Sequence, residues 1–208
     1  MNLTELPHRT LAIVRGTDRD AALRTVLILA EEGITAAEVS LTTPDALWVI
    51  ERARRELGPH ATLGAGTVLT AADAARAADA GASFLVTPGL GQDLRHGPRP
   101  ELPLLIGALT PSEVIAANES GALAVKLFPA SLGGPGYLKA LRDPFPSVPF
   151  VPVGGIDAAA ALAYLAAGAV AVGVGSPLVG DAADGGDLDA LRERVARWRT
   201  ALTEEVAA

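Results

Sequence analysis

The chain has 208 residues, of which 50% are hydrophobic and 20% charged, and this length suits one domain, residues 1–208, better than two. No window reaches the roughly 18 uncharged apolar residues of a membrane span, and the formal charge of −7 argues against nucleic acid or a membrane as partner. Cysteine is absent, which excludes disulfides and thiolate chemistry, and this composition fits the reducing cytoplasm.

Short β-rich runs alternate with helical segments rich in Ala, Leu and Arg, which is the pattern of a parallel sheet covered by helices. Glycines and prolines mark most of the expected helix ends. The expected strands are 11–15, 35–41, 62–68, 84–87, 102–109, 124–130, 150–153 and 170–176. The expected helices are 20–32, 44–57, 70–80, 110–120, 137–142, 157–167 and 188–205, with a short helix at best within 91–100, a glycine-rich loop over 133–136 and a frayed tail at 206–208.

Eight such β/α units in about 200 residues predict an α/β fold of the (β/α)₈ barrel type, at the small end of its size range. Right-handed crossovers between the parallel strands would close this sheet naturally. A doubly wound open sheet is the structural alternative.

Lys126 is one of only two lysines, with Lys139 the other, and it lies within an apolar run. The period of two of a strand places Lys126 on the face of Phe128, opposite Val125 and Leu127. Moving an ammonium out of water is costly, so burial favours the neutral amine. A neutral amine is the nucleophile that forms a Schiff base with a ketone. The alternative is a strand-end lysine that reaches solvent.

Glu38 lies within the second expected strand, on the face that it shares with Ala36 and Ser40. A charged side chain is better placed at the mouth of a barrel, where the carboxyl ends of the strands form the active site, than beneath a helix. Glu38 and Lys126 are therefore expected to reach the same ligand, where a carboxylate beside an amine can shuttle protons. A structural ion pair is the alternative.

Two further polar residues end neighbouring strands. Arg15 ends the first strand and could bind a carboxylate through two parallel hydrogen bonds, although a surface or intersubunit salt bridge is also compatible with its position. Thr67 near the end of the third strand could offer its hydroxyl to a carboxylate, or could be a turn threonine among glycines.

Glycines at the ends of the last two strands predict a phosphate site. Gly154 and Gly155 follow the seventh strand, and residues 173–176 read Gly-Val-Gly-Ser at the end of the eighth. Glycines there let backbone N–H groups approach a phosphate, and the following helix N-termini add partial positive charge. Many (β/α)₈ barrels bind phosphate at this place.

Histidines offer no metal site in the sequence, because His8, His60 and His96 fall in expected loops without a strand-end carboxylate beside them. We therefore expect no metal and no cofactor.

With these residues in view, the sequence resembles the class I aldolase family of 2-keto-3-deoxy-6-phosphogluconate (KDPG) and 2-keto-4-hydroxyglutarate (KHG) aldolases. The resemblance covers nearly the whole chain. It rests on Ile13–Gly16, Ala37–Val39, Gly64–Val68, Thr87–Gly89, Val125–Ala130, Val153–Ile156 and Gly173–Ser176.

This resemblance implies a (β/α)₈ barrel, usually a homotrimer, that uses no metal. It implies reversible cleavage of a small phosphorylated keto acid, a 2-keto-3-deoxy-6-phospho sugar acid, to pyruvate and D-glyceraldehyde 3-phosphate, and some such enzymes cleave 4-hydroxy-2-oxoglutarate. Lys126 would be the Schiff-base lysine and Glu38 the acid/base. The remaining implied contacts are Thr67 for the pyruvate-side carboxylate, Gly154, Gly155, Gly175 and Ser176 for the phosphate, and Pro88, Phe128 and Val153 as pocket walls.

Two positions depart from the gluconate-type pattern. That pattern carries Arg four residues after the catalytic Glu, where this chain has Thr42, so the carboxylate contact could shift to Arg15. Val153 stands where Thr is frequent. Together with residues 134–141, these positions are closer to the 6-phosphogalactonate (KDPGal) branch, and the sugar epimer stays open because such discrimination rests on few contacts.

Two other functions are compatible with a phosphate-binding barrel. One is an epimerase or thiamine phosphate synthase, but the metal-binding or pyrophosphate-binding residues that these need are not visible. The other is a non-catalytic phosphosugar-binding protein, in which replacement of Lys126 would abolish no turnover.

Overall fold

The computed structural model describes residues 1–204, and the eight strands of this part form one parallel sheet. The strands are β1 (Thr10–Val14), β2 (Ala36–Ser40), β3 (Thr62–Gly66), β4 (Leu85–Val86), β5 (Leu104–Ala108), β6 (Ala124–Leu127), β7 (Phe150–Pro152) and β8 (Val172–Val174). Their order is β7-β6-β5-β4-β3-β2-β1-β8, and a parallel bridge between Val153 and Gly173 joins the two ends. The sheet therefore closes into a (β/α)₈ barrel, which confirms the expected fold and rules out the open sheet.

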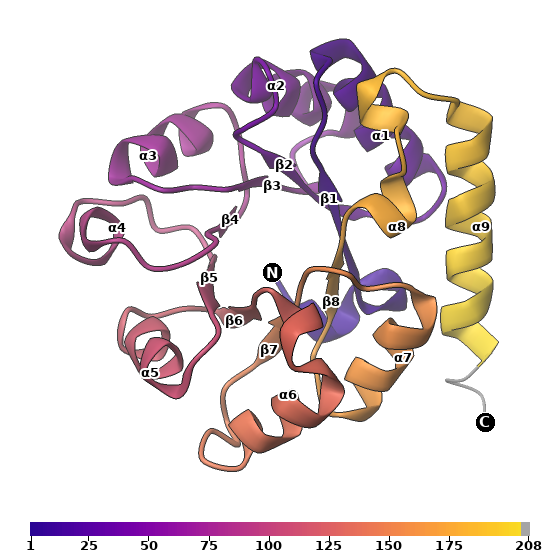
Figure 1. The fold of residues 1–208 in the computed structure, drawn as a ribbon. Coiled ribbons are helices and arrows are strands. Elements are labelled where there is room, and N and C mark those ends of the chain that lie inside the picture. Colours follow the sequence, from indigo (N-terminus) through magenta and orange to yellow (C-terminus); the bar gives the residue numbers. More distant parts are fainter. Residues whose placement is uncertain (205–208) are drawn as a thin grey trace.

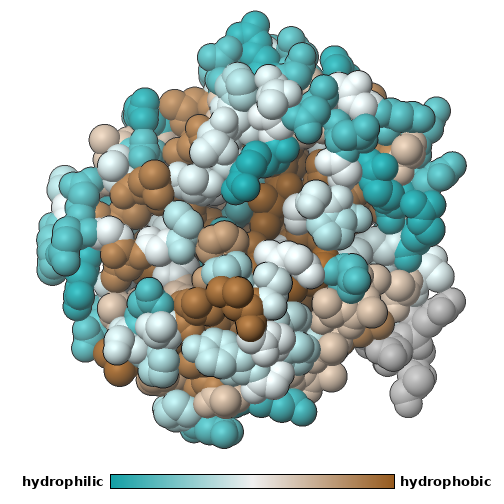
Figure 2. Space-filling model, viewed as in Figure 1, coloured by the Kyte–Doolittle hydropathy of each residue, from teal (hydrophilic) through white to brown (hydrophobic). Residues whose placement is uncertain are grey.

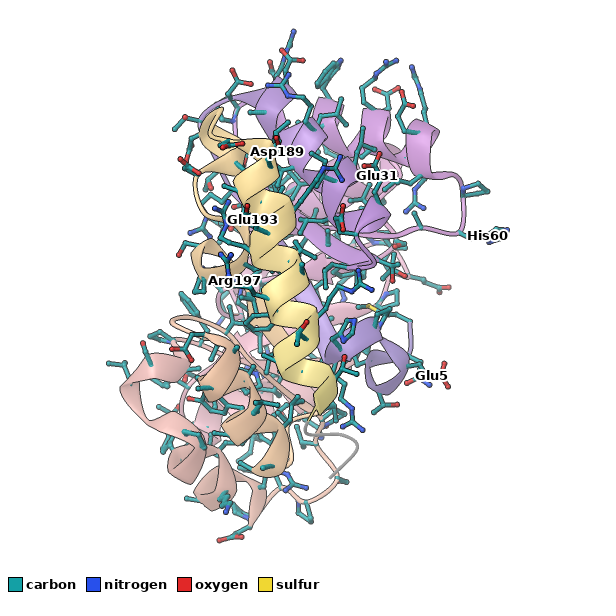
Figure 3. The ribbon with its side chains drawn as sticks, turned by 90° about the vertical axis from the view of Figure 1, so that its right-hand side faces the viewer. Glu5, Glu31, His60, Asp189, Glu193 and Arg197 are labelled. Carbon is teal, nitrogen blue, oxygen red and sulfur yellow. The ribbon has the colours of Figure 1, made fainter. Side chains whose placement is uncertain are left out.

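Helices surround this barrel (Figure 1). They are α1 (Arg19–Glu31), α2 (Ala46–Leu57), α3 (Ala71–Asp79), α4 (Gln92–His96), α5 (Pro111–Glu119), α6 (Gly134–Arg142), α7 (Ala158–Ala166), α8 (Ser176–Val179) and α9 (Leu188–Glu204). Figure 3 shows α9 running lengthwise on the outside, with Asp189, Glu193 and Arg197 along it. Arg192 binds it to the end of α1 through Glu31 at 3.0 Å and Glu32 at 2.6 Å. None of the helices in residues 1–204 is long and apolar enough to cross a membrane.

The expected sixth strand, 124–130, ends at Leu127, and a 3-10 helix follows over Ala130–Leu132. Two further segments differ in type from the sequence expectation. The glycine-rich stretch 133–136 was expected to be a loop, but α6 begins at Gly134, because a proline at its first turn suits a helix start. Ser176 was expected to end the eighth strand, but it opens α8, which the sequence pattern missed because its four residues are too few to show a helical period. Residues 205–208, including the expected frayed tail, lie outside the described part.

The core has two layers, which correspond to the two faces of the strands. Ala37 and Val39 pack against the helices, whereas Ala36 belongs to a separate cluster inside the barrel together with Ala124 of β6. Glu38 follows Ala36 by two residues, and Lys126 follows Ala124 by two, so both charged residues share the interior face. They lie one pleat nearer to the carboxyl ends of the strands, as the strand period predicts.

The opposite end of the barrel is closed by Leu3 and Leu6, which belong to the interior cluster.

Arginines cap the C-terminal ends of helices, because a guanidinium can donate to the carbonyls that a helix end leaves unpaired. Each of four such carbonyls accepts a hydrogen bond from one arginine: Gly81 from Arg54, Ser120 from Arg99, Ala167 from Arg142 and Glu32 from Arg199.

Candidate active site

Lys126 and Glu38 form a buried pair inside the barrel mouth. Lys126 Nζ lies 4.0 Å from Glu38 Oε1, and their side chains are 7% and 2% exposed. The two strands that carry them lie four places apart in the sheet, so the side chains meet across the interior and not along one edge. The structure thus brings together the two residues that the sequence singled out, and Lys126 does not reach solvent as a strand-end lysine would.

Burial raises the pKa of the Glu38 carboxyl, while the nearby charges of Lys126 and Arg15 oppose that rise. Glu38 Oε2 is buried and has no hydrogen-bond partner among residues 1–204. An unpaired buried carboxylate oxygen is costly, so this atom is available to a substrate hydroxyl or a water. A carboxyl whose pKa is raised can both accept and donate a proton near neutral pH.

Phe128 and Pro88 border this pair. The Phe128 ring centroid lies 5.2 Å from Lys126 Nζ, and the ring is partly open to solvent. Lys126 pairs with Gly107 of β5, where an added Cβ would lie 2.1 Å from the Pro88 carbonyl oxygen. The end of β4 therefore packs directly on β5 at the register position of Lys126, so Phe128 and Pro88, two of the three expected wall residues, lie near the lysine.

Hydroxyls gather at the ends of β2 and β3. The Ser40 hydroxyl lies 2.8 Å from both Thr42 Oγ1 and Thr67 Oγ1, and Arg15 Nε donates to it at 3.4 Å. Thr67 has a φ of 59°, which is unusual for a β-branched residue. Among the described residues Arg15 has no carboxylate within 4.0 Å, so no salt bridge occupies its guanidinium. Arg15 and Thr67 thus stand together, as candidates for one carboxylate require.

The four candidate phosphate residues leave the sheet at neighbouring points, because Val153 pairs with Gly173. Gly154 and Gly155 have φ values of 104° and 71°, a conformation that favours glycine. A Cβ at Gly154 would lie 3.5 Å from the Phe128 ring, which places this loop beside the wall of the lysine site. Gly175 precedes α8 and Ser176 begins it. Pro177 carries no N–H and Leu178 N donates to the Gly175 carbonyl at 2.9 Å, so the Ser176 N–H is the donor that this first turn leaves for an anion among the described residues.

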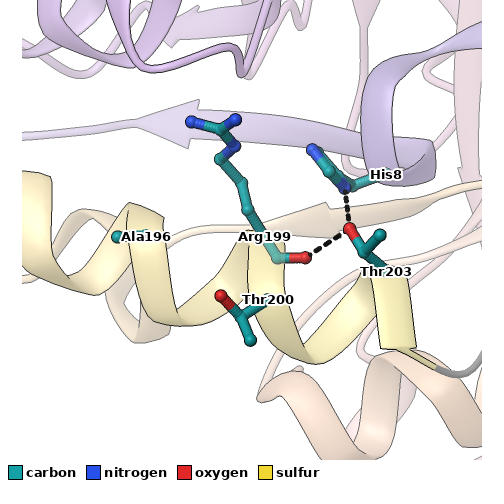
Figure 4. Close-up of a pocket in the computed structure, with 5 residues that line it drawn as sticks. All are labelled: His8, Ala196, Arg199, Thr200 and Thr203. Atoms are coloured by element: carbon teal, nitrogen blue, oxygen red, sulfur yellow. Dashed lines mark hydrogen bonds between the residues drawn. The ribbon is translucent and has the colours of Figure 1, made fainter.

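The histidines lie away from this site. His60 follows α2 and points outward (Figure 3), and His8 precedes β1 at the opposite end of the barrel. Figure 4 shows His8 in a surface pocket, with its Nδ1 3.4 Å from Thr203 Oγ1, which itself donates to the Arg199 carbonyl. The described residues contain no group of three His, Asp or Glu side chains placed to hold a metal ion.

Comparison with known proteins decides the family. A family model described as KDPG and KHG aldolase matches residues 4–193. The chain belongs to the KDPG and KHG aldolase family. The resemblance seen in the sequence is confirmed, and with it the class of the enzyme, a lyase that breaks carbon–carbon bonds.

Individual members of the KDPG and KHG aldolase family match the chain well. A 2-dehydro-3-deoxy-phosphogluconate aldolase of Pseudomonas aeruginosa is 45% identical over 66% of this chain and 63% of that protein. A solved structure described as native KDPGal covers 98% of both chains with a TM-score of 0.86 and 31% identity. The KDPG aldolase of Legionella pneumophila, solved with pyruvate captured as a covalent carbinolamine, covers 96% of this chain and 95% of that one, with a TM-score of 0.82 and 30% identity.

Sequence reasoning missed the role of Ser40 in this site. Ser40 had appeared only as a neighbour on the Glu38 face, yet its hydroxyl contacts Arg15, Thr42 and Thr67. The available signal was that Ser40 follows Glu38 by two residues in a strand, which places its hydroxyl on the same interior face and nearer to the mouth.

Proposed function

We propose that the protein is a class I aldolase that cleaves a 2-keto-3-deoxy-6-phospho sugar acid reversibly to pyruvate and D-glyceraldehyde 3-phosphate. The observation that carries this proposal is the buried Lys126–Glu38 pair, with a 4.0 Å separation and one unpaired carboxylate oxygen. The carbinolamine named for the Legionella pneumophila relative supports the same chemistry here.

In the proposed reaction, the neutral Lys126 amine attacks the C2 ketone to give a carbinolamine, which loses water to form a protonated imine. Glu38 then removes the proton of the C4 hydroxyl through water as the C3–C4 bond breaks. The bonding electrons pass into the imine and leave an enamine of pyruvate, while C4 becomes the aldehyde carbon. Protonation of the enamine at C3 and hydrolysis of the imine release pyruvate and restore the amine.

The binding residues divide the substrate between two ends of the mouth. Arg15 and Thr67 would hold the carboxylate, since they lie together and no ion pair occupies the guanidinium. The phosphate would lie against Gly154, Gly155, Gly175 and Ser176, with Val153 as the wall between the two ends. The chain needs such local sites because its formal charge of −7 repels anions.

We further propose a preference for the galactonate-type epimer, based on Thr42 and Val153. The test is the ratio of kcat/KM for KDPGal to that for KDPG, which should exceed one. Cleavage of 4-hydroxy-2-oxoglutarate, measured as pyruvate release, is the third arm of the same assay.

We also propose a homotrimer in the cytoplasm. Exposed apolar side chains on the loops at the barrel mouth, Leu69 and Leu132, support a partner surface, and Figure 2 shows apolar residues gathered near the centre of the face viewed in Figure 1. A cysteine-free chain fits a reducing compartment. Sedimentation equilibrium should give a mass of three chains.

Borohydride trapping with pyruvate tests the central proposal. Lys126→Ala should abolish the reduced adduct seen by intact-mass and peptide mass spectrometry, whereas Lys139→Ala should retain it. Lys139 is the only other lysine and is exposed on α6, so it makes a matched control. An adduct that is absent from folded wild-type protein, or that persists in the Lys126 variant, would refute the class I mechanism. Turnover should also survive a chelator.

A further inference from the structure

Ser40 holds a central place in the site although the proposed reaction gives it no role. It is the last residue of β2, it is fully buried, and it lies on the interior face two residues after Glu38. Its hydroxyl has three side-chain neighbours: Thr42 and Thr67 at 2.8 Å each, and the Arg15 guanidinium at 3.4 Å. All three belong to the ends of β1, β2 and β3, where the carboxylate is expected.

The hydrogen count of this cluster fixes its direction. A serine hydroxyl carries one hydrogen and two acceptor lone pairs, while a guanidinium only donates. Arg15 Nε donates to the Ser40 oxygen at 3.4 Å and the Thr42 backbone N–H donates to it at 3.5 Å, so two N–H groups use its lone pairs. The Ser40 hydrogen then goes to a threonine hydroxyl, whose own hydrogen stays free to bind an anion.

Thr67 is the threonine that the backbone holds in place. Its φ of 59° costs energy for a β-branched residue, and such strain persists only where the surroundings fix it. Hydrogen bonds on both sides do so, from Leu41 N to Gly66 O at 2.8 Å and from Val68 N to Val86 O at 3.1 Å. The side chain is thereby held against the serine hydroxyl.

We propose that Ser40 is a positioning residue for carboxylate binding, which orients Arg15 and leaves the Thr67 hydrogen free for the substrate. The guanidinium polarises the Ser40 hydroxyl and so strengthens its bond to the threonine. This inference rests on the proposed function, which places the carboxylate of the keto acid against Arg15 and Thr67. Ser40 touches neither the amine nor the bond that breaks.

The test measures the pyruvate concentration that gives half of the maximal borohydride-trapped adduct. Ser40→Ala should raise it about tenfold, the effect of one lost hydrogen bond, while the maximal adduct stays unchanged. In the cleavage assay KM should rise by a similar factor and kcat should change less than about threefold. Ser40→Thr, which restores a hydroxyl, should return both values towards wild type.

A double-mutant cycle separates positioning from simple packing. Thr67→Val should raise the half-saturating concentration about as much as Ser40→Ala, and the double variant should be no worse than either single one. Effects that multiply, or an unchanged concentration in Ser40→Ala, would overturn the inference while leaving the aldolase proposal intact. An adduct missing from wild type would instead remove the proposed function. If Ser40→Ala does not fold, Ser40→Cys keeps the volume, lacks a strong acceptor, and should show the same shift.

Discussion

Gly66 and Glu38 lie so close that the glycine has no room for a side chain. A Cβ built on Gly66 would lie 2.6 Å from Glu38 Oε1 and 2.8 Å from its carboxyl carbon. Gly66 is the last residue of β3, and Glu38 faces it from the neighbouring strand β2. The position of the Glu38 carboxylate therefore depends on the absence of one methyl group.

Gly66→Ala should preserve the fold and impair the reaction. The clashing atoms belong to the end of a flexible side chain, so the carboxylate can turn away, but this changes its distance from Lys126. A misplacement of about 1 Å can cost on the order of 100-fold in rate, and we expect kcat to fall by about that factor. Gly136→Ala is the matched control, because a Cβ there meets nothing within 4 Å and α6 gains helix propensity. Circular dichroism and steady-state kinetics would check both, and equal kcat in the two variants would contradict the expectation.

Glu38→Gln should remove a pH dependence of stability. Burial raises the folded-state pKa of this carboxyl above its unfolded-state value. As pH rises through the interval between the two values, the unfolded chain loses its proton first, so the free energy of unfolding falls. Above the folded-state pKa the free energy of unfolding no longer changes with the protonation of Glu38. Glutamine does not titrate, and urea midpoints of the variant should therefore fall less over that interval.

The same Glu38→Gln variant should lose most of its turnover. General acid–base groups contribute roughly 10²–10⁴-fold, and kcat should fall by a factor in that range while pyruvate still forms a trapped adduct on Lys126. If the Glu38→Gln variant had the same kcat as wild type, Glu38 would have no acid–base role in the mechanism.

Phe128→Ala should open the lysine site to water. The ring centroid lies 5.2 Å from Lys126 Nζ, and its body shields the amine. Dry sites strengthen electrostatic interactions, so we expect kcat/KM to fall on the order of tenfold, about 1.4 kcal/mol. Phe128→Leu keeps an apolar cover and should lose less. Equal losses in both variants would assign the effect to the aromatic face and not to the exclusion of water.

Arg54→Ala should destabilise the barrel without touching its site. The guanidinium donates to the Gly81 carbonyl at 2.8 Å and to the Ala61 carbonyl at 2.8 Å, among other acceptors at the end of α2 and the start of β3. Hydrogen bonds to charged groups contribute about 1.5–3 kcal/mol each, and we expect a loss of roughly 2 kcal/mol or more by urea denaturation. Arg55→Ala, which removes an exposed pair with Glu51, should cost under about 1 kcal/mol. If Arg54→Ala and Arg55→Ala lowered the free energy of unfolding equally, water would replace Arg54 at these carbonyls without a cost in stability.

Much of this fold follows from the sequence, because each β/α unit carries its own local signals. Thr70 and Thr110, for example, cap α3 and α5 with a side-chain bond to the third residue of the helix. Strand ends were less certain: the first two expected strands differ from β1 and β2 by one residue at each end. The end of a strand depends on its hydrogen bonds to the neighbouring strands, and these cannot be seen in the sequence of the strand itself.

The pairing of Lys126 with Glu38 was predictable for a similar reason. Strand parity fixes the face of each residue, and barrel closure turns a shared face into proximity. The hydroxyl cluster was not predictable, because it depends on the φ of Thr67 and on the distance between two loops. Such details arise from tertiary packing and leave no periodic trace in the sequence.

The arginines that cap the C-terminal ends of helices and the Glu38 carboxyl respond differently to pH. A guanidinium keeps its charge at every pH at which proteins are handled. The bonds from Arg54, Arg142 and Arg199 to helix-end carbonyls are all of this kind. Glu38, the proposed acid/base, lies at the opposite end of the barrel. These helix-end bonds therefore keep their charge while the protonation of Glu38 changes with pH. Rate profiles are best recorded beside unfolding curves, because the same Glu38 titration also lowers the free energy of unfolding.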